Sequence, residues 1–336
     1  MKKLINSAES LTADALAGMA AAHPDLRIDP RTHVISRADA PVPGKVGVVS
    51  GGGAGHEPLH GGYVGRGMLD AAVVGEVFTS PTPDRILAAL RAADSGRGVL
   101  QIVKNYTGDT LNFAMAAELA EDLGIAVRTV VVDDDAATGT PDGTPGRSAG
   151  RRGTGATVFV ERVCGALAEQ GADLTAVADA GARVNAATRS IAIALTACTV
   201  PAVGRAGFEL PDDRIEFGVG IHGEPGLRTE PLRPASEIVQ DALAVLLDQL
   251  PPGDDDRTIV MVNGLGATPL LELYVVLNEA SAVLRKAGLT VAHTLVGNYV
   301  TALDMAGVSL TVCRADERTL GLWNTPVNTP ALRWGC

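Results

Sequence analysis

The sequence predicts an α/β protein with two domains, each built on a mostly parallel or mixed sheet with flanking helices. The chain has 336 residues, which is enough for two domains of ordinary size with separate hydrophobic cores. Short runs rich in β-branched residues alternate with longer segments of helical spacing, a pattern typical of α/β proteins. A composition of 46% hydrophobic and 20% charged residues also indicates a folded globular chain.

Seven apolar runs have the length of buried strands, and one longer segment has the spacing of an amphipathic helix. The predicted strands span residues 45–49, 99–103, 126–132, 191–197, 258–262, 289–295 and 308–313. The predicted helix has Thr268 as its N-cap and Pro269 at its first position, and it ends at Gly288.

The domain boundary is expected near residue 185. A helical pattern that starts at Thr154 gives way there to the strand that begins at Ile191. We therefore expect domains at 1–185 and 186–320, with a tail of about 320–336 that packs back on the first domain. Residues 133–155 are crowded with Asp, Gly, Thr, Pro and Arg, which predicts an irregular surface loop.

Charge and hydropathy argue against nucleic-acid and membrane partners. The formal net charge is −11, which disfavours binding to a phosphate backbone. The first ten residues contain no apolar signal-peptide core, and the most hydrophobic stretch, 191–200, is too short to span a bilayer. We expect a cytoplasmic protein. The four cysteines form no CxxC pair and are expected to be free thiols, with Cys164 and Cys198 buried.

A glycine-rich segment with the sequence SGGGAGHEP, residues 50–58, follows the predicted strand at 46–49. Glycines allow backbone N–H groups to approach a ligand closely, so the segment predicts a binding loop that carries His56. The dinucleotide fingerprint is disfavoured because His56 occupies its third glycine position and Pro58 follows. His60 is near enough in sequence to share the rim of the same pocket.

A second polar segment, residues 104–109, follows the predicted strand at 99–103. Ligands of open α/β sheets collect at the carboxyl ends of strands, so this segment and the glycine-rich one could face one pocket. Asp109 has two interpretations: it caps the helix that follows, or it accepts a proton from a substrate hydroxyl.

A third candidate is His222, which lies between glycines in the segment FGVGIHGEPG at 217–226. Its ring is not crowded by its sequence neighbours. Histidine with glutamate in two glycine-rich turns is compatible with a metal site, but there is no HExxH pair and no compact ligand cluster. We therefore predict no metal bound by this chain.

Taken together, these segments resemble the K subunit of dihydroxyacetone kinases, and the likeness runs essentially from end to end. The matching motifs are MKKLIN at 1–6, RADAP at 37–41, GGGAGHEP at 51–58, FTSPTP at 78–83, KNYTGD at 104–109, GRRG at 150–153, FGVGIHGEPG at 217–226 and NTPAL at 328–332.

The resemblance implies a two-domain α/β protein, commonly a homodimer, that binds dihydroxyacetone. In this family the histidine that matches His222 attacks the substrate ketone and forms a covalent hemiaminal, which excludes glycerol because a polyol has no carbonyl carbon. By the same resemblance Asp109 is the general base for the hydroxyl and His56 hydrogen-bonds that hydroxyl. The sugar site is lined by Gly53, Ala54, Gly55, His56, Lys104, Asp109 and His222.

The resemblance also places the nucleotide on another protein, the L subunit. The chain contains no GxxxxGK[ST] phosphate loop, which agrees with this expectation. Magnesium and ATP, or ADP recharged by a phosphotransferase-system phosphocarrier, are expected on that partner. Single-chain relatives continue into an L domain, whereas this sequence stops at Cys336, so we expect a separate L subunit.

Two alternatives stay open. Ala54 stands where many relatives have serine, which motivates a kinase subunit for erythrulose or another short ketose. A second alternative is a non-catalytic relative that senses dihydroxyacetone and acts as a coactivator of transcription. The presence of both His56 and Asp109 favours the enzyme.

Overall fold

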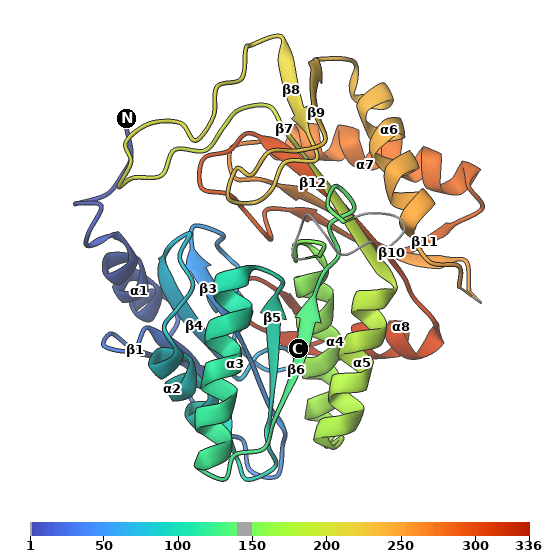
Figure 1. The fold of residues 1–336 in the computed structure, drawn as a ribbon. Coiled ribbons are helices and arrows are strands. Elements are labelled where there is room, and N and C mark those ends of the chain that lie inside the picture. The colour runs from blue at the N-terminus through green and yellow to red at the C-terminus, as the bar shows by residue number, and fades with distance from the viewer. Residues whose placement is uncertain (1, 140–149, 254) are drawn as a thin grey trace. The chain divides into compact units, whose positions relative to one another are not determined.

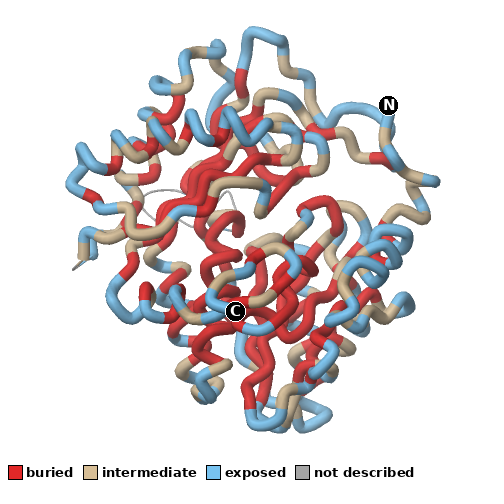
Figure 2. Tube along the Cα trace, turned by 180° about the vertical axis from the view of Figure 1, so that it is seen from behind, coloured by how far each residue is buried: buried red, intermediate tan, exposed pale blue. Residues whose placement is uncertain are grey.

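The computed structural model describes residues 2–139, 150–253 and 255–336 (Figure 1). These residues form two compact units, each assembled from segments that are far apart in the sequence. Unit I contains residues 2–132, 157–183 and 319–336. Unit II contains the described residues of 133–156 and 184–318. Figure 2 shows buried residues along the strands within each unit.

Helices and strands alternate along the chain, as the sequence predicts. In order they are α1 Leu11–Ala22, β1 Leu26–Asp29, β2 Val34–Arg37, β3 Gly47–Ala54, the short 3₁₀ turn Gly61–Tyr63, β4 Ala71–Val77, α2 Pro83–Ala93, β5 Val99–Lys104, α3 Thr107–Asp122, β6 Val127–Val132, α4 Ala156–Glu169, α5 Leu174–Ala186, β7 Thr188–Ala194, β8 Arg214–Phe217, β9 Arg228–Pro231, α6 Ala235–Gln249, β10 Arg257–Gly264, α7 Leu270–Lys286, β11 Thr290–Gly297, β12 Gly307–Arg314, α8 Glu317–Trp323, β13 Val327–Asn328 and β14 Arg333–Trp334. All seven predicted strands are present.

Unit I is built on a six-stranded mixed sheet of order β1-β2-β4-β3-β5-β6. The β4-β3-β5-β6 part is parallel, and β1 and β2 add antiparallel pairs at one edge. Side chains alternate across the sheet, and this alternation divides the residues of β3 and β5 between its two faces. Val49 and Val103 belong to the aliphatic core beneath α2 and α3, whereas Ser50 and Lys104 lie on the opposite face.

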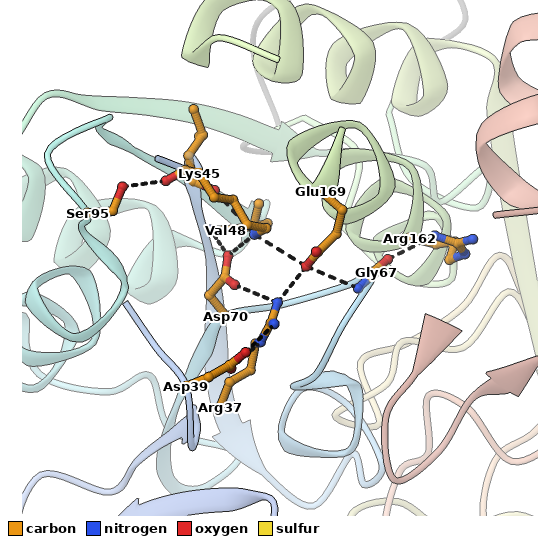
Figure 3. A network of polar contacts seen from close by, with 10 residues as sticks. Arg37, Asp39, Lys45, Val48, Gly67, Asp70, Ser95, Arg162 and Glu169 are labelled. Atoms are coloured by element: carbon orange, nitrogen blue, oxygen red, sulfur yellow. Dashed lines mark hydrogen bonds and ion pairs between the residues drawn. The ribbon is translucent and has the colours of Figure 1, made fainter. Parts of the chain in front are cut away.

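A buried ion-pair network ties the sheet of unit I to α4 (Figure 3). The carboxylate of Asp70 accepts hydrogen bonds from Arg37, Lys45 and the backbone N–H of Val48. Arg37 also contacts Glu169 near the end of α4. Burial raises the pKa of Asp70, and the two cations oppose that effect. Since an unpaired buried charge is costly, these contacts fix the position of α4 on the unit.

Unit II is built on a second six-stranded mixed sheet, of order β11-β10-β12-β7-β8-β9. Only β10 and β11 are parallel. The helices α6 and α7 pack on the sheet through an aliphatic core that includes Ile193, Val260, Leu243 and Leu273. Both sheets are mixed and carry flanking helices, so the predicted fold class is confirmed.

Two local predictions were wrong. Helix α7 begins at Leu270 with Pro269 as its N-cap, because the hydroxyl of Thr268 is occupied by the backbone of Gly307. The described residues of the predicted loop at 133–155 are irregular as predicted, but they are not all at the surface. The carboxylate of Asp134 is wholly buried and accepts hydrogen bonds from the N–H groups of Thr154 and Ala156 at 2.6 and 2.9 Å. The polar composition of the loop predicted exposure to solvent. The carboxylate of Asp134 is buried instead, because it accepts hydrogen bonds from N–H groups at the start of α4. Residues 140–149 of that prediction lie outside the described residues.

The structure describes all four cysteines. Cys164, Cys198 and Cys313 are buried and Cys336 is exposed, and all four are free thiols as predicted. No helix within the described ranges is long and apolar enough to cross a membrane.

Two glycine-to-alanine changes test the packing of unit I in opposite directions. A Cβ at Gly165 in α4 would overlap the backbone of Met68, whereas nothing lies within 4 Å of a Cβ at the exposed Gly18 in α1. We expect Gly165→Ala to lower the free energy of unfolding by about 1–3 kcal/mol. Gly18→Ala should raise it by about 0.5–1 kcal/mol, because alanine is the better helix former. Urea unfolding measures both, and an unchanged Gly165→Ala would contradict the contact between α4 and Met68.

Candidate functional site

Asp109 lies in the first turn of α3, immediately beyond the end of β5. The residue is 4% exposed, and one carboxylate oxygen accepts a hydrogen bond from the hydroxyl of Ser80. Tyr106 is the N-cap of α3, so the interpretation of Asp109 as a simple helix cap is wrong. A carboxylate in the first turn is favoured by the helix dipole. Asp109 is therefore held as a buried proton acceptor.

Lys104, the last residue of β5, brings a buried ammonium next to this carboxylate. Its Nζ atom lies 3.7 Å from Oδ2 of Asp109 and 2.9 Å from Nε2 of His60. A Cβ at Gly52 would overlap this Nζ atom, so only glycine at that position leaves room for it. The side chain of Lys104 thus extends from β5, and its ammonium occupies the space that a side chain at Gly52 of β3 would fill.

The glycines at 51–53 belong to β3, so the prediction that they form a loop was wrong. They continue the parallel pairing of β3 with β4. A Cβ at Gly51 would lie 2.5 Å from the carbonyl oxygen of Val73, and one at Gly53 would lie 2.5 Å from the nitrogen of Thr79. The glycines therefore serve close packing of the chain on itself as well as space for Lys104.

His56 follows β3 and is 1% exposed. Its ring stacks on Phe78, with ring centroids 5.0 Å apart and an angle of 18° between the planes. Phe78 has a φ of 56°, which is rare for a residue other than glycine. Its N–H donates to the carbonyl oxygen of Ala54 at 2.9 Å. All of the predicted sugar-site residues except His222 belong to unit I: Gly53, Ala54, Gly55, His56, Lys104 and Asp109.

His60 was predicted at a pocket rim, and the structure instead buries it behind Lys104. Its Nδ1 atom lies 2.9 Å from the hydroxyl of Ser50 and 2.6 Å from Oε1 of Glu161. Burial lowers the pKa of His60 well below its usual value, and the charges of Lys104 and His56 act in the same direction. His60 is therefore a neutral imidazole at neutral pH.

His222 belongs to unit II, in the turn that follows β8. Its Nδ1 atom lies 2.9 Å from Oε1 of Glu224, and its backbone N–H donates to the other oxygen of the same carboxylate at 2.9 Å. Burial alone would raise the pKa of Glu224, but the hydrogen bonds and charge of His222 outweigh it and lower this pKa to about 2. In the neutral form of the ring, an Nδ1–H directed at this carboxylate leaves the lone pair on Nε2.

The turn around His222 depends on Gly220 and Arg152. A Cβ at Gly220 would overlap the carboxylate of Glu224 and lie 2.5 Å from the guanidinium of Arg152. Arg152 donates to the carbonyl oxygen of Gly218 at 2.9 Å and pairs with Asp135 at 2.7 Å. These contacts place Arg152 beneath the turn and fix its shape.

Sequence reasoning assigned no role to Ser80, Arg152, Glu161 or Glu224. Three of them lie in or beside quoted motifs: Ser80 in FTSPTP, Arg152 in GRRG and Glu224 two residues after His222. Glu161 lies in no quoted motif. The structure brings the predicted residues of unit I together in one neighbourhood and places His222 in unit II.

The described residues contain no group of three or more His, Cys, Asp or Glu side chains able to hold a metal ion. The expectation that this chain binds no metal or nucleotide remains a prediction.

Comparison with known proteins defines the family. The Dak1 domain model matches residues 17–331, which is most of the chain. This chain belongs to the Dak1 family. It is 47% identical, over 100% of both chains, to the dihydroxyacetone-binding subunit of the PEP-dependent dihydroxyacetone kinase of Escherichia coli K12. It is 48% identical to the dihydroxyacetone-binding subunit of PTS-dependent dihydroxyacetone kinase 1 of Listeria innocua, over 98% of this chain and 100% of the relative.

Solved structures agree with the assignment to Dak1. The dihydroxyacetone kinase of C. freundii superposes with a TM-score of 0.90 at 34% identity, covering 99% of this chain and 60% of that one. A dihydroxyacetone kinase operon co-activator superposes with a TM-score of 0.88 at 33% identity, covering 95% and 97% of the two chains. The shared fold alone therefore does not separate kinase from co-activator.

The low pKa of Glu224 predicts how this Dak1 protein responds to acid. Because the pKa in the folded state, about 2, is below the ordinary value of 4.5, the ionised carboxylate stabilises the fold above about pH 4.5 and this stabilisation is lost as the pH falls toward 2. Glu224→Gln should lower the free energy of unfolding by on the order of 1 kcal/mol at about pH 6, a value reduced for solvent screening of a partly exposed pair.

The difference between Glu224→Gln and the native chain should shrink as the solution is acidified, which unfolding curves over a pH series would measure. Glu237→Gln, whose carboxylate is 55% exposed and 3.5 Å from Arg233, is the matched control and should show little change. A constant difference at all pH values would contradict the ion-pair account of Glu224.

Proposed function

We propose that this Dak1 chain is the dihydroxyacetone-binding subunit of a kinase that phosphorylates the ketose to dihydroxyacetone phosphate. The observation that carries the proposal is the Nδ1–H of His222 directed at the carboxylate of Glu224, which leaves Nε2 as a nucleophile. Two relatives with 47% and 48% identity are named dihydroxyacetone-binding subunits, and they align over essentially the whole chain.

His222 selects a carbonyl compound by forming a bond to it. The Nε2 lone pair adds to the ketone carbon and the carbonyl π electrons move to oxygen. That oxygen takes up a proton from solvent, and the ring keeps its Nδ1 proton and carries a positive charge. The product is a tetrahedral hemiaminal that retains both hydroxymethyl groups of the sugar. Glycerol has no electrophilic carbon and cannot react. The carboxylate of Glu224 stabilises the positive charge that develops on the ring as the bond forms.

Asp109 acts on the hydroxyl that receives the phosphoryl group. As the hydroxyl oxygen bonds to phosphorus, the bond from phosphorus to the donor's leaving oxygen breaks, and the hydroxyl proton passes to the carboxylate. The hydroxyl of Ser80 donates to one carboxylate oxygen and so orients the other. His56 hydrogen-bonds the same substrate hydroxyl, and the stack on Phe78 fixes its ring. The backbone of residues 53–55 and the ammonium of Lys104 complete the contacts to the sugar.

The phosphoryl donor is bound by a separate L subunit, which supplies the nucleotide and magnesium. Magnesium neutralises charge that develops on the transferred phosphoryl group. The two relatives are named as subunits of PEP- or PTS-dependent kinases, which favours a phosphotransferase-system phosphocarrier over free ATP as the ultimate donor. We extend the proposal to a homodimer in the cytoplasm, as the family resemblance implies.

Two alternative functions, a ligand-sensing coactivator and a kinase for another ketose, have unequal support. A ligand-sensing coactivator is less favoured, because identity to the kinase subunits is 47–48% and identity to the co-activator is 33%. Buried His56 and Asp109 also fit phosphoryl transfer. A kinase for erythrulose or another short ketose is motivated by Ala54. Comparing turnover of dihydroxyacetone and erythrulose with the cognate L subunit decides between these substrates.

Covalent binding can be observed without the L subunit. Dihydroxyacetone labelled with carbon-13 at its ketone carbon should show that resonance move into the range of tetrahedral carbons when the chain is added, since the hemiaminal carbon is sp³. His222→Ala should abolish the shift, and Asp109→Asn should retain it. A tetrahedral signal that persists in His222→Ala would refute the role of His222.

The role of Asp109 predicts a loss of rate rather than a loss of binding. With the cognate L subunit present, Asp109→Asn should reduce the rate of phosphoryl transfer by about 100- to 10,000-fold, the usual contribution of general acid–base catalysis. Asp122→Asn, at the exposed opposite end of α3, is the matched control and should keep the native rate. A rate for Asp109→Asn within a few fold of native would remove Asp109 from the mechanism.

A further inference from the structure

Behind the proposed ketose contacts of unit I, three buried ionisable side chains touch in series. Glu161 of α4 is 0% exposed, His60 is 4% exposed and Lys104 is 1% exposed. Oε1 of Glu161 lies 2.6 Å from Nδ1 of His60, and Nε2 of His60 lies 2.9 Å from Nζ of Lys104. The series therefore joins a carboxyl group within a helix to the ammonium 3.7 Å from the carboxylate of Asp109.

Hydrogen-bond roles restrict how protons can be placed along this series. An ammonium only donates, so a charged Lys104 requires His60 to accept at Nε2 and to hold its proton on Nδ1. That Nδ1–H then points at Glu161, which must be a carboxylate to accept it. The hydroxyl of Ser50 donates to the carbonyl oxygen of Ile102 at 2.8 Å, so its oxygen is a second acceptor for the same N–H.

The opposite arrangement moves both protons. Glu161 is then a neutral acid, His60 holds its proton on Nε2 and Lys104 is a neutral amine that accepts it. The net charge of the series is zero in both arrangements, so moving between them adds no charge to the interior. An imidazolium between Glu161 and a neutral lysine is disfavoured, because burial lowers the pKa of His60.

Neighbouring groups decide between the two arrangements. Nζ of Lys104 faces the carboxylate of Asp109 and lies 3.5 Å from the carbonyl oxygen of Gly51, and both contacts favour the ammonium. Burial raises the pKa of Glu161 and favours the neutral acid, whereas Ser50 and the charge of Lys104 lower that pKa and favour the carboxylate. The contacts of Nζ with Asp109 and Gly51 favour the ammonium, and with it the carboxylate form of Glu161. Oε2 of Glu161 has no hydrogen-bond partner among the described residues.

Two further titratable groups bear on this balance. Burial raises the pKa of the Cys164 thiol on the same helix, and the charge of Glu161 acts in the same direction, so this thiol stays neutral. His56 acts on His60 and further disfavours an imidazolium there. Asp109 contacts Lys104 directly, and Glu161 is connected to it through His60.

We propose that Glu161 and His60 are positioning residues that hold Lys104 as an ammonium at the ketose contacts. The inference rests on the proposed function, because it assumes that Lys104 contacts the sugar. Glu161 provides an anion that the reaction does not consume, whereas Asp109 loses its negative charge when it takes up the hydroxyl proton. Lys104 therefore keeps one anionic partner throughout the reaction, because the imidazole of His60 connects it to Glu161 by hydrogen bonds.

Removing the charge of Glu161 should change the pH dependence of ketose binding. Glu161→Gln keeps the size of the side chain and an oxygen that accepts from Nδ1–H, but it has no charge. A nearby anion favours the charged form of a buried amine, and this effect is absent in Glu161→Gln. Calorimetric titration of Glu161→Gln with dihydroxyacetone from about pH 6 to about pH 10 should show the native affinity at the acid end. At the alkaline end, the variant should bind at least about tenfold more weakly than the native chain.

Asp70→Asn is the matched control, because it removes another buried carboxylate of unit I that pairs with Arg37 and Lys45 instead. It should lower stability and leave the pH dependence of binding unchanged. If Glu161→Gln follows the native pH dependence, the inference is overturned while the proposed function stands. If the native chain does not bind dihydroxyacetone at any pH, the proposed function fails.

A measurement on the native chain decides the proton positions even if Glu161→Gln does not fold. Nitrogen-15 NMR of labelled histidine distinguishes the two neutral tautomers, and the His60 signals are assigned by their loss in His60→Asn. The proposal requires the proton of His60 on Nδ1 at neutral pH, with Nε2 as acceptor. A proton on Nε2 would make Lys104 a neutral amine and overturn the proposal without reference to any ligand.

Discussion

The buried ammonium of Lys104 is the constraint on which the rest of unit I depends. A charge taken out of water costs several kcal/mol unless it is paired and hydrogen-bonded. The fold satisfies it with a carboxylate in the first turn of α3, an imidazole that accepts, and a glycine on β3 that leaves room for it. Asp109, which we propose as the general base, and Gly52 are consequently structural requirements of the buried lysine.

Patterns that depend on neighbouring residues in the sequence predicted much of the fold. Apolar runs rich in β-branched residues and segments of helical spacing predicted the seven strands and the α/β class, because these signals reflect local burial. Residues 104–109 were placed at the end of a strand for the same reason. The glycines at 51–53 were misjudged, since the sequence says nothing of which atoms approach a strand from the side. They lie in β3 and accommodate Val73, Lys104 and Thr79.

Contacts between distant segments could not be predicted. Glu161 and His60 are 101 residues apart, and Asp134 caps the start of α4 from more than twenty residues away. Neither contact has a local sequence signal, because each depends on how helices pack on a sheet. His222 and Glu224 are only two residues apart, so their contact is local. It could not be predicted because it depends on the turn geometry that Gly220 permits.

The chemistry proposed for this Dak1 chain divides recognition of a ketose into a carbonyl step at His222 and a hydroxyl step at Asp109. The most direct test is a crystal structure of the chain with dihydroxyacetone. The account predicts continuous density from Nε2 of His222 to a tetrahedral central carbon, with a terminal hydroxyl within hydrogen-bond distance of Asp109. A planar ketone with no bond to His222 would contradict it.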